Sequence, residues 1–385
     1  MRSVIVGAGI AGLALAVELS RHGWDSTVIE ARYPGAGNST RNVGRVRRMQ
    51  LTPELTEFAC RAADKWANIE RVNGGRNPLL YPTDYVWALY DDAEREVVEP
   101  MQPMWEHYGA RARVVDEQAV LRAVPVLVGG ERTVGGVIGA AGIVHHDAAV
   151  YAYLLAAREA GVRLEVGASA VGIEELDGRG VEVKLENGRA IRGDVAVNAA
   201  GGSSGDFARA CGLAAPNVAL RREVLVTEPS RPFMTPAVTF YRPQEGWFNQ
   251  TLRGELVAGV VDVDEPFGMN EQSSLSFLGR TARVLLQKAP RLAELRVVRQ
   301  WAGVYDTTPD KCPLVGAYPG SETVYALNGW SGRGILLAPY SAELLARAIA
   351  CGERDALLVP FDPARFAAGA GAVTSSSDYY SGYAH

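Results

Sequence analysis

The feature that most constrains the fold is a glycine-rich turn near the start of the chain, between a strand and a helix. Residues 3–6 are largely apolar, a G-x-G-x-x-G turn occupies residues 7–12, a helical pattern continues to Arg21, and a second strand over residues 26–29 ends at Glu30. In such a βαβ unit the first glycine permits a tight turn, the second lets the backbone approach a pyrophosphate, and the third lets helix and strand pack closely. The pattern predicts a Rossmann-type α/β domain that binds an adenine dinucleotide. The alternative is a glycine-rich turn without a ligand.

Glu30 refines this prediction. It follows Gly12 by 18 residues, where a carboxylate can accept hydrogen bonds from both ribose hydroxyls. An acid at this place also disfavours a 2′-phosphate, so NADP is a poor candidate.

Size and charge exclude two other classes of protein. The chain has 385 residues, 48% of them hydrophobic, which excludes a disordered chain and favours two domains. With 39 basic and 44 acidic residues the net charge is −5, and there is no lysine- or arginine-rich block, so we expect no nucleic acid partner. Arginine supplies nearly all the positive charge; the lysines are Lys65, Lys184, Lys288 and Lys311.

Cysteine spacing and hydropathy favour a cytoplasmic protein. The cysteines are scattered without a C-x-x-C spacing, which argues against a zinc cluster or a disulfide framework. The apolar N-terminus lacks the cleavage-like exit of a secretory signal. No stretch reaches the roughly 18 consecutive apolar residues of a membrane span.

Alternating helix and strand patterns predict two interleaved domains. A dinucleotide-binding α/β domain is expected over residues 1–82, 143–212 and 300–365. An α+β substrate domain with a mainly antiparallel sheet is expected over residues 83–142 and 213–299. Residues 366–385, rich in alanine, glycine, serine and tyrosine, are expected to form a mobile tail.

The individual elements are expected as follows. Helices are predicted over residues 53–72, 92–108, 148–160, 274–288 and 338–351. Strands are predicted over residues 85–90, 163–166, 171–175, 194–201, 222–227, 238–241, 247–251 and 255–261, with hairpin turns at Asp177-Gly178 and Asn187-Gly188.

Several segments carry a resemblance to a known family. They are VIVGAGIAGLALAVEL with VIE, GNSTRNVGRVR, VNAAGGSS, REVLVTEP, GELVAGV, WAGVYDTTPDKCPLVG and NGWSGRGILLAPYSAELLARAI. Over about residues 3–363 the chain resembles the flavin-dependent amine oxidoreductases of the D-amino-acid-oxidase superfamily. The nearest likeness is to glycine oxidase, monomeric sarcosine oxidase, and the β subunits of heterotetrameric sarcosine oxidase and dye-linked proline dehydrogenase.

The resemblance implies FAD as the cofactor. In the family a helix N-terminus near the C-terminus of the chain faces the flavin carbonyl O2, and backbone amides there stabilise the anionic reduced flavin. Val171 is implied to place its backbone against the adenine. The expected cofactor-binding residues are Gly7, Gly9, Ile10, Ala11, Gly12, Glu30, Ala31, Arg32, Ser39, Thr40, Val171, Ala200, Gly201, Gly303, Gly329, Gly332, Arg333, Gly334 and Ile335.

Three departures from the family pattern matter. Gly303 stands where monomeric sarcosine oxidase tethers its flavin through a cysteine, which implies non-covalent FAD. Tyr305 stands where glycine oxidase carries its carboxylate-binding arginine. The oxygen-activating lysine of sarcosine oxidase falls near Val257, and no lysine lies close to it in sequence, which favours a dehydrogenase over a fast oxidase.

Arg47 matches the arginine that binds the substrate carboxylate in sarcosine oxidase, and a guanidinium suits that role. Other candidates for this role lie nearby in the sequence: Arg41, Arg45 and Arg48. Tyr305, Trp330 and Trp247 are candidates for the pocket wall, although buried aromatic residues commonly serve only the core. The expected catalytic residues are Arg47, Tyr305 and Trp330.

The sequence His145-His146-Asp147 resembles the segment at which the β subunit of heterotetrameric sarcosine oxidase links a second flavin, FMN. A structural role for His146, as a helix cap or in core hydrogen bonds, is the favoured alternative, and adjacent histidines point apart, which disfavours a metal site.

The expected reaction is the oxidation of the C–N bond of a small amino acid or N-alkyl amino acid such as proline, a sarcosine-like compound or a D-amino acid. A hydride leaves the α-carbon for flavin N5, and the electrons pass to a quinone, a dye-like carrier or oxygen. Three alternatives stay open: a peroxide-producing oxidase, a 2-hydroxy-acid or glycerol-phosphate dehydrogenase, and a flavin subunit that is active only with partner subunits. A homo-oligomer is also possible.

Overall fold

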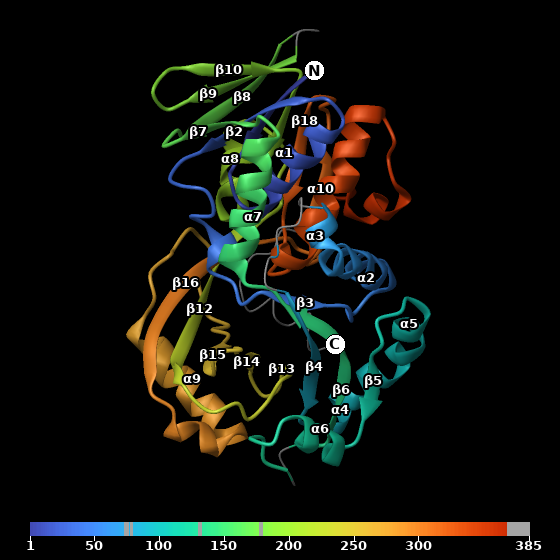
Figure 1. Ribbon diagram of the computed structural model, residues 1–385, viewed down its shortest axis with the longest axis vertical. Coiled ribbons are helices and arrows are strands. Elements are labelled where there is room, and N and C mark those ends of the chain that lie inside the picture. The colour runs from blue at the N-terminus through green and yellow to red at the C-terminus, as the bar shows by residue number, and fades with distance from the viewer. Residues whose placement is uncertain (73–76, 78–79, 130–132, 177–179, 368–385) are drawn as a thin grey trace.

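Two β-sheets of different construction divide the computed structural model, one in its upper half and one in its lower half in Figure 1. The structure describes residues 1–72, 77, 80–129, 133–176 and 180–367. The predicted hairpin turn at Asp177-Gly178 and nearly all of the predicted tail lie outside these residues.

The upper sheet has six strands in the order β17-β18-β11-β1-β2-β7. β1 (Arg2–Val6) runs parallel to both neighbours, β2 (Asp25–Glu30) and β11 (Val195–Asn198). The other parallel strands are β7 (Arg163–Val166) and β18 (Val324–Asn328), and β17 (Leu314–Ala317) is an antiparallel edge. In parallel sheets the carboxyl ends of strands meet at one edge, and that edge is where ligands bind. Here it is formed by the residues that follow β1, β2, β11 and β18.

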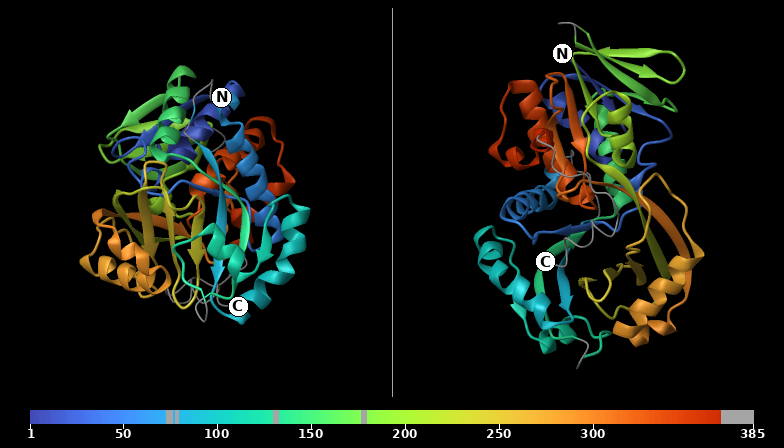
Figure 2. Two further views of the ribbon diagram at one scale, coloured as in Figure 1. Left: turned by 60° about the horizontal axis from the view of Figure 1, so that its bottom comes forward. Right: turned by 180° about the vertical axis from the view of Figure 1, so that it is seen from behind.

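Helices cover one face of this sheet. α1 (Ile10–Arg21) is buried from its first turn through Leu19 because it packs between the sheet and α10 (Gly334–Cys351), α2 (Pro53–Ala67) and α7 (His146–Glu159). Figure 2 shows α10 beside the N-terminal helices from behind. The other face is covered by α8 (Ser204–Ala210) and a three-stranded sheet of β8 (Ala170–Leu176), β9 (Gly180–Leu185) and β10 (Ala190–Gly193).

The lower sheet has nine strands and is mainly antiparallel, as predicted. Its order is β16-β12-β15-β14-β13-β4-β6-β3, with β5 (Arg113–Val115) also paired to β6. The strands are β3 (Arg45–Arg47), β4 (Tyr81–Leu89), β6 (Gly135–Ile143), β12 (Val218–Pro229), β13 (Ala237–Phe240), β14 (Gly246–Gln250), β15 (Glu255–Val260) and β16 (Val297–Thr307). The one parallel pair is β13 with β4. The remaining helices are α3 (Ile69–Val72), α4 (Asp92–Val98), α5 (Gln102–His107), α6 (Glu117–Ala123) and α9 (Leu275–Lys288).

Three helix predictions were wrong in their bounds. The helix expected over residues 53–72 is divided into α2, which ends at Ala67, and α3, which begins at Ile69. The helix expected over residues 92–108 is broken into α4, a 3₁₀ turn (Glu99–Met101) and α5, with Pro100 and Pro103 in the first turns of the second and third pieces. Proline has no backbone N–H to continue a helix but is tolerated at a helix start. α10 begins at Gly334 instead of residue 338, so Gly334 and Ile335 belong to its first turn.

Two strands connect the two sheets to the same site. The strands β3 and β16 pair within the lower sheet. All of β3 and most of β16 fall within segments that were expected to form the dinucleotide-binding domain. Both strands end close to the carboxyl edge of the upper sheet, so they carry side chains from the lower sheet to that edge.

Within the described residues, α10 is the one helix long and apolar enough to cross a membrane. More than half of it is buried inside the molecule, as in the core helix of a folded domain.

Candidate functional site

An elongated cavity lies at the carboxyl edge of the upper sheet. It begins beside Glu30, passes the glycine turn, and ends at Tyr305 and the first turn of α10. Its walls come from the β1–α1 turn, the end of β2, the 37–42 loop, residues 168–170, the turn after β11, and the β18–α10 turn. We call it the dinucleotide cavity.

The glycine turn has the close contacts that its motif predicts. Gly7 has φ +106°, and a Cβ there would lie 2.5 Å from the carbonyl oxygen of Ala199. A Cβ on Gly12 would lie 2.0 Å from the carbonyl oxygen of Gly7, so the helix packs directly on the turn. At Gly9 a Cβ would lie 2.9 Å from Ser39 Oγ, which accepts a hydrogen bond from Ile10 N at 3.0 Å. Any side chain at these positions would fill the turn.

Glu30 lies at the far end of the cavity, fixed by two backbone amides. Its Oε2 accepts a hydrogen bond from Ala8 N at 3.0 Å, and its Oε1 accepts one from Arg32 N at 2.9 Å. Arg32 also pairs with Glu271 at 2.7 Å, and hydrogen bonding to Arg32 holds the pKa of Glu271 below its usual range. Glu271 thus brings a loop of the lower half of the molecule over this end.

The opposite end is shaped by the turn between β18 and α10. Asp306 Oδ2 accepts a hydrogen bond from Gly329 N at 2.7 Å, and its carbonyl oxygen accepts one from Ser331 N at 3.0 Å. Burial raises the pKa of Asp306 to about 7. Gly332 has φ +87°, and a Cβ on it would lie 2.5 Å from the ring of Tyr305. The first turn of α10 leaves backbone amides without intrahelical partners at this point.

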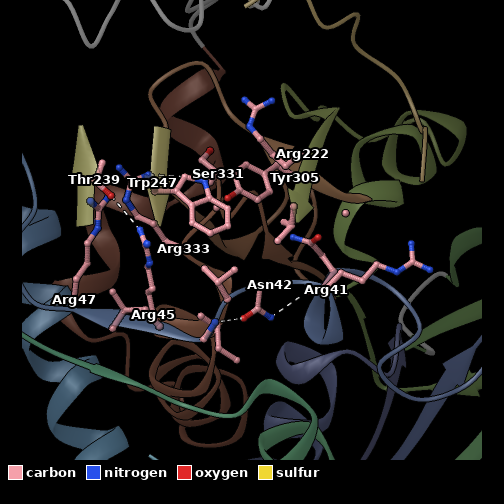
Figure 3. Close-up of a pocket in the computed structure, with 18 of the residues that line it drawn as sticks. Arg41, Asn42, Arg45, Arg47, Arg222, Thr239, Trp247, Tyr305, Ser331 and Arg333 are labelled. Atoms are coloured by element: carbon pink, nitrogen blue, oxygen red, sulfur yellow. Dashed lines mark hydrogen bonds between the residues drawn. The ribbon is translucent and has the colours of Figure 1, made fainter. Parts of the chain in front are cut away.

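A second, smaller pocket opens from the Tyr305 end, and we call it the substrate pocket. The two cavities share Asn38, Asn42, Tyr305, Gly332 and Ile335. Figure 3 shows Tyr305, Ser331 and Trp247 on one side of the pocket and Asn42 opposite, with Arg222 next to Tyr305. The guanidinium of Arg222 lies 5.3 Å from the centre of the Tyr305 ring. The charged side chains that line the substrate pocket are Arg41, Arg45, Arg47, Arg222, Glu245 and Arg333.

The neighbouring arginines of β3 have different surroundings. Arg45 is held by side-chain oxygens of Thr239 and Asn249 and by the carbonyl oxygens of Val238 and Phe248, and burial lowers its pKa to about 10. These bonds fix it as part of the wall. Arg47 donates from Nη1 to Tyr85 Oη at 2.8 Å.

Two other arginines near Arg47 in sequence take part in pairs away from the pocket centre. Arg41 lies 2.7 Å from Glu271 and points away from the other guanidinium groups in Figure 3. Arg48 donates to Asp64 on α2 at 2.5 Å and does not line the pocket. Among these four arginines, Arg47 is therefore the candidate for binding a substrate carboxylate.

The expected site residues fall into three groups. Those that line the dinucleotide cavity are Gly7, Gly9, Ile10, Ala11, Glu30, Ala31, Arg32, Ser39, Ala200, Gly201, Tyr305, Trp330, Gly332, Gly334 and Ile335. Those that lie on the substrate pocket are Arg47, Gly303, Tyr305, Gly332, Arg333 and Ile335. Those that line neither are Gly12, Thr40, Val171 and Gly329.

Four of these residues have surroundings that differ from the expected ones. Residues 168–170 form the wall where Val171 was expected, and half of Val171 is exposed. Thr40 donates to the carbonyl oxygen of Gly35. Trp330 lies on the dinucleotide cavity instead of the substrate pocket. Arg333 donates from Nε to Gln50 and from Nη1 to the carbonyl oxygen of Lys311, because the turn before α10 directs it toward the substrate side.

Sequence reasoning missed four residues of the site: Asn38, Arg222, Glu245 and Asp306. A Cβ on Gly303 would lie 2.0 Å from Asn38 Oδ1, so the glycine that removes a covalent link also admits this side chain. Arg222 and Glu245 belong to the lower sheet and carry no local motif. For Asp306 a signal existed, since it is a lone acid at the end of the mostly apolar stretch WAGVY in the segment that resembles the family.

The histidine pair lies at the N-terminus of α7. His145 Nδ1 accepts a hydrogen bond from Ala148 N at 3.5 Å, so His145 caps the helix where His146 was considered for that role. The two rings stack 5.5 Å apart. Neither residue lines the dinucleotide cavity or the substrate pocket, and the described residues include no group of three side chains that could hold a metal.

The dinucleotide cavity fits FAD. A glycine turn that a Cβ would fill, a carboxylate held at the ribose end, and a helix N-terminus at the other end are what an extended dinucleotide with a ring at its end requires. The residues that line this cavity would hold FAD.

Comparisons with known proteins agree with this site. Residues 2–348 match the DAO family, described as FAD dependent oxidoreductase. The chain is 27% identical over 372 residues to the sarcosine oxidase subunit beta of Rhizobium meliloti (strain 1021), across 95% of this chain and 88% of that protein. It is 26% identical over 372 residues to the glycine oxidase of Pseudomonas aeruginosa (strain PAO1), across 94% of this chain and 98% of that protein. The crystal structure of L-proline dehydrogenase from P. horikoshii matches with a TM-score of 0.87 at 24% identity, across 96% and 98% of the two chains. This chain belongs to the DAO family of FAD-dependent oxidoreductases.

Proposed function

We propose that this enzyme oxidises the C–N bond of a small amino acid or N-alkyl amino acid, with FAD bound non-covalently. The observation that carries the proposal is the position of Arg47 in a polar pocket that opens onto the α10 end of the dinucleotide cavity. A carboxylate held by Arg47 would therefore lie in the same connected space as the flavin end of the cofactor. The names of the relatives, sarcosine oxidase and glycine oxidase, agree with an amino-acid substrate.

In this proposal the chain orients the substrate and favours the reduced cofactor. FAD, when bound, supplies a two-electron acceptor. Arg47 binds the carboxylate and limits the orientations of the α-carbon, and orientation alone contributes much of the rate of such reactions. The amides at the N-terminus of α10 stabilise negative charge at their end of the cavity. The walls of Tyr305, Trp247 and Ile335 limit access of water.

Non-covalent binding is supported by the identity of the lining residues. The described cysteines are Cys60, Cys211, Cys312 and Cys351, and none of them lines either cavity. Gly303, at the position of the tether in monomeric sarcosine oxidase, has no side chain. After precipitation of the protein in acid, FAD should remain in the supernatant; flavin in the pellet would refute this part of the proposal.

We further propose that the physiological electron acceptor is a quinone or a dye-like carrier rather than oxygen. Val257 lies within β15, paired with Val226 and Asn249, and it lines neither cavity. The sequence did not reveal that Lys311 lies near Glu245 and Arg333 of the substrate pocket, where burial lowers its pKa to about 8. Because Lys311 lies close enough to affect the reaction with oxygen, the test of the acceptor must include a Lys311→Met variant. Slow reoxidation of the reduced flavin by air, in both the parent enzyme and this variant, would support a dehydrogenase.

The test of the proposed reaction is turnover with a panel of amino acids. The purified protein is mixed with a dye acceptor and with glycine, sarcosine, proline and small D-amino acids. Dye reduction is followed together with release of ammonia or methylamine or, for proline, formation of a cyclic imine. One amino acid should reduce the dye and yield stoichiometric product. If only 2-hydroxy acids reduce the dye, the proposed C–N oxidation is wrong.

A second candidate is a flavin subunit that is active only in a complex. Two kinds of relatives are named as subunits, sarcosine oxidase subunit beta and hydrogen cyanide synthase subunit HcnC. Sedimentation of the purified chain, with activity measured before and after co-expression with the products of neighbouring genes, distinguishes this candidate from an independent enzyme.

A further inference from the structure

Glu245 is a partly buried acid in the substrate pocket with no assigned role. It lies in the turn between β13 and β14, where its carbonyl oxygen accepts a hydrogen bond from Val261 N at 2.8 Å. Among the described residues that line the pocket, it is the only one with an anionic side chain. Its Oε2 atom is buried and has no hydrogen-bond partner in the described part of the chain. Such an atom is costly unless a ligand satisfies it.

The charges around Glu245 come from four separate elements. Arg222 on β12, Arg47 on β3, Lys311 in the loop after β16 and Arg333 just before α10 all act on its carboxyl group. Burial raises the pKa of Glu245, and these four cations oppose that effect. Four separate segments thus bring positive charge to one acid of the substrate pocket.

This arrangement is complementary to an amino acid. An amino acid carries a carboxylate and an ammonium group on one carbon, and the pocket offers a guanidinium and a carboxylate. Charge-assisted hydrogen bonds of both kinds are stronger than neutral ones. A 2-hydroxy acid would satisfy Arg47 but would bring no cation to Glu245.

We propose that Glu245 binds the amino group of the substrate and accepts a proton from it. The proposal rests on the proposed C–N oxidation and adds a residue to it. An N–H bond of the ammonium group breaks, its electron pair stays on nitrogen, and the proton forms an O–H bond with Oε2 of Glu245. The substrate becomes a neutral amine with a lone pair, which is the form that can lose a hydride from the α-carbon. Glu245 becomes a neutral acid and returns its proton to water before the next turnover.

The test compares two ligands that differ only in the amino group. 2-Aminoisobutyrate has no α-hydrogen and binds without being oxidised, and isobutyrate lacks the amine. Their dissociation constants are measured on the oxidised holoenzyme from changes in the flavin absorbance. In Glu245→Gln, 2-aminoisobutyrate should bind about 10- to 100-fold more weakly, because a charge-assisted hydrogen bond is lost. Isobutyrate should bind at least as tightly as before, because a nearby negative charge has been removed.

Glu94 provides a matched control. It is also a glutamate with a raised pKa and a buried, unpartnered oxygen, Oε1, but it lies on α4 and lines neither cavity. Glu94→Gln should leave the affinity for both ligands unchanged. If Glu245→Gln weakens both ligands equally, Glu245 only positions the arginines, and the proposal is wrong.

The unmodified enzyme gives a test that does not depend on the folding of a variant. As pH falls and Glu245 takes up a proton, 2-aminoisobutyrate should bind more weakly and isobutyrate more tightly. Parallel changes for the two ligands would contradict the proposal.

The failure of this inference differs from the failure of the proposed function. If amino acids reduce the enzyme but the two ligands respond alike, only the role of Glu245 is wrong. If no amino acid reduces the enzyme and neither ligand perturbs the flavin, both proposals fall.

Discussion

The two cavities that meet at Tyr305 are built from different parts of the chain. Turns at the carboxyl ends of the upper-sheet strands form most of the dinucleotide cavity, and it depends on glycines and backbone amides, as at Gly7 and Gly12. Charged side chains brought together by the lower sheet form the substrate pocket, as with Arg47, Arg222 and Glu245. We infer that the first cavity is fixed by local geometry and the second by tertiary packing. Substitutions should therefore have different consequences in the two regions.

The largest effect is expected in the glycine turn. Gly12→Val would place side-chain atoms against the carbonyl oxygen of Gly7, 2.0 Å from the new Cβ, and this contact is with backbone, which has little room to relax. We expect a loss of at least about 3 kcal/mol of stability and loss of retained FAD. Thermal unfolding and the flavin-to-protein absorbance ratio measure both.

The matched control for this substitution is Gly279→Ala on α9. A Cβ at Gly279 meets nothing within 4 Å, and alanine favours a helix over glycine by roughly 1 kcal/mol. This variant should be as stable as the parent or more so. A Gly12→Val protein that keeps FAD would show that the close contact does not shape the cavity.

In the substrate pocket, Arg47→Ala should impair substrate binding while FAD is retained. Removing the guanidinium that pairs with a carboxylate typically costs 2–5 kcal/mol, so KM for amino acids should rise by about two to three orders of magnitude. Arg48→Ala, one residue further on and paired with Asp64, should leave KM unchanged. An unchanged KM in Arg47→Ala would remove Arg47 from the site.

These two cases also show what the sequence can predict. The βαβ unit, Glu30 and the C-terminal glycine turn are contiguous patterns whose spacing has a direct physical meaning, so the upper sheet and most of the dinucleotide cavity were predictable. Glu245 and Arg222 were not, because their proximity depends on the pairing of β12 with β15, of β15 with β14 and of β14 with β13. The position of Lys311 was missed for the same reason. Lys311 is far from Val257 in the sequence, and separation in sequence does not predict the distance from the pocket in the folded chain.

A pH-dependent effect is expected where the two cavities meet. Burial raises the pKa of Asp306 to about 7, so the folded chain holds this proton more tightly than the unfolded chain. Asp306 therefore contributes stability that is fully present below about pH 4 and is lost as pH rises through about 7, on the order of 4 kcal/mol in total.

Asp306→Asn isolates this contribution, because the amide oxygen can still accept the hydrogen bond of Gly329 N. The difference in free energy of unfolding, parent minus variant, should decrease as pH rises from about 5 to about 8. A difference that stays constant or grows with pH would mean that Asp306 is ionised in the folded protein.

The smallest effect is expected at the histidine pair, outside both cavities. His145→Ala removes the acceptor of a long hydrogen bond at the start of α7, which should cost only about 0.5 kcal/mol. Flavin content should stay unchanged in this variant and in His146→Ala. A loss of flavin from either would instead support a second flavin at this segment.

A substrate held in the Arg47 pocket should give its electrons to FAD in the adjoining cavity. Anaerobic mixing of the yellow holoenzyme with amino acids tests it directly, without any added acceptor. We predict that one small amino acid bleaches the oxidised flavin fully and that air restores the colour only slowly. Bleaching of the flavin by 2-hydroxy acids, but by no amino acid, would contradict this prediction.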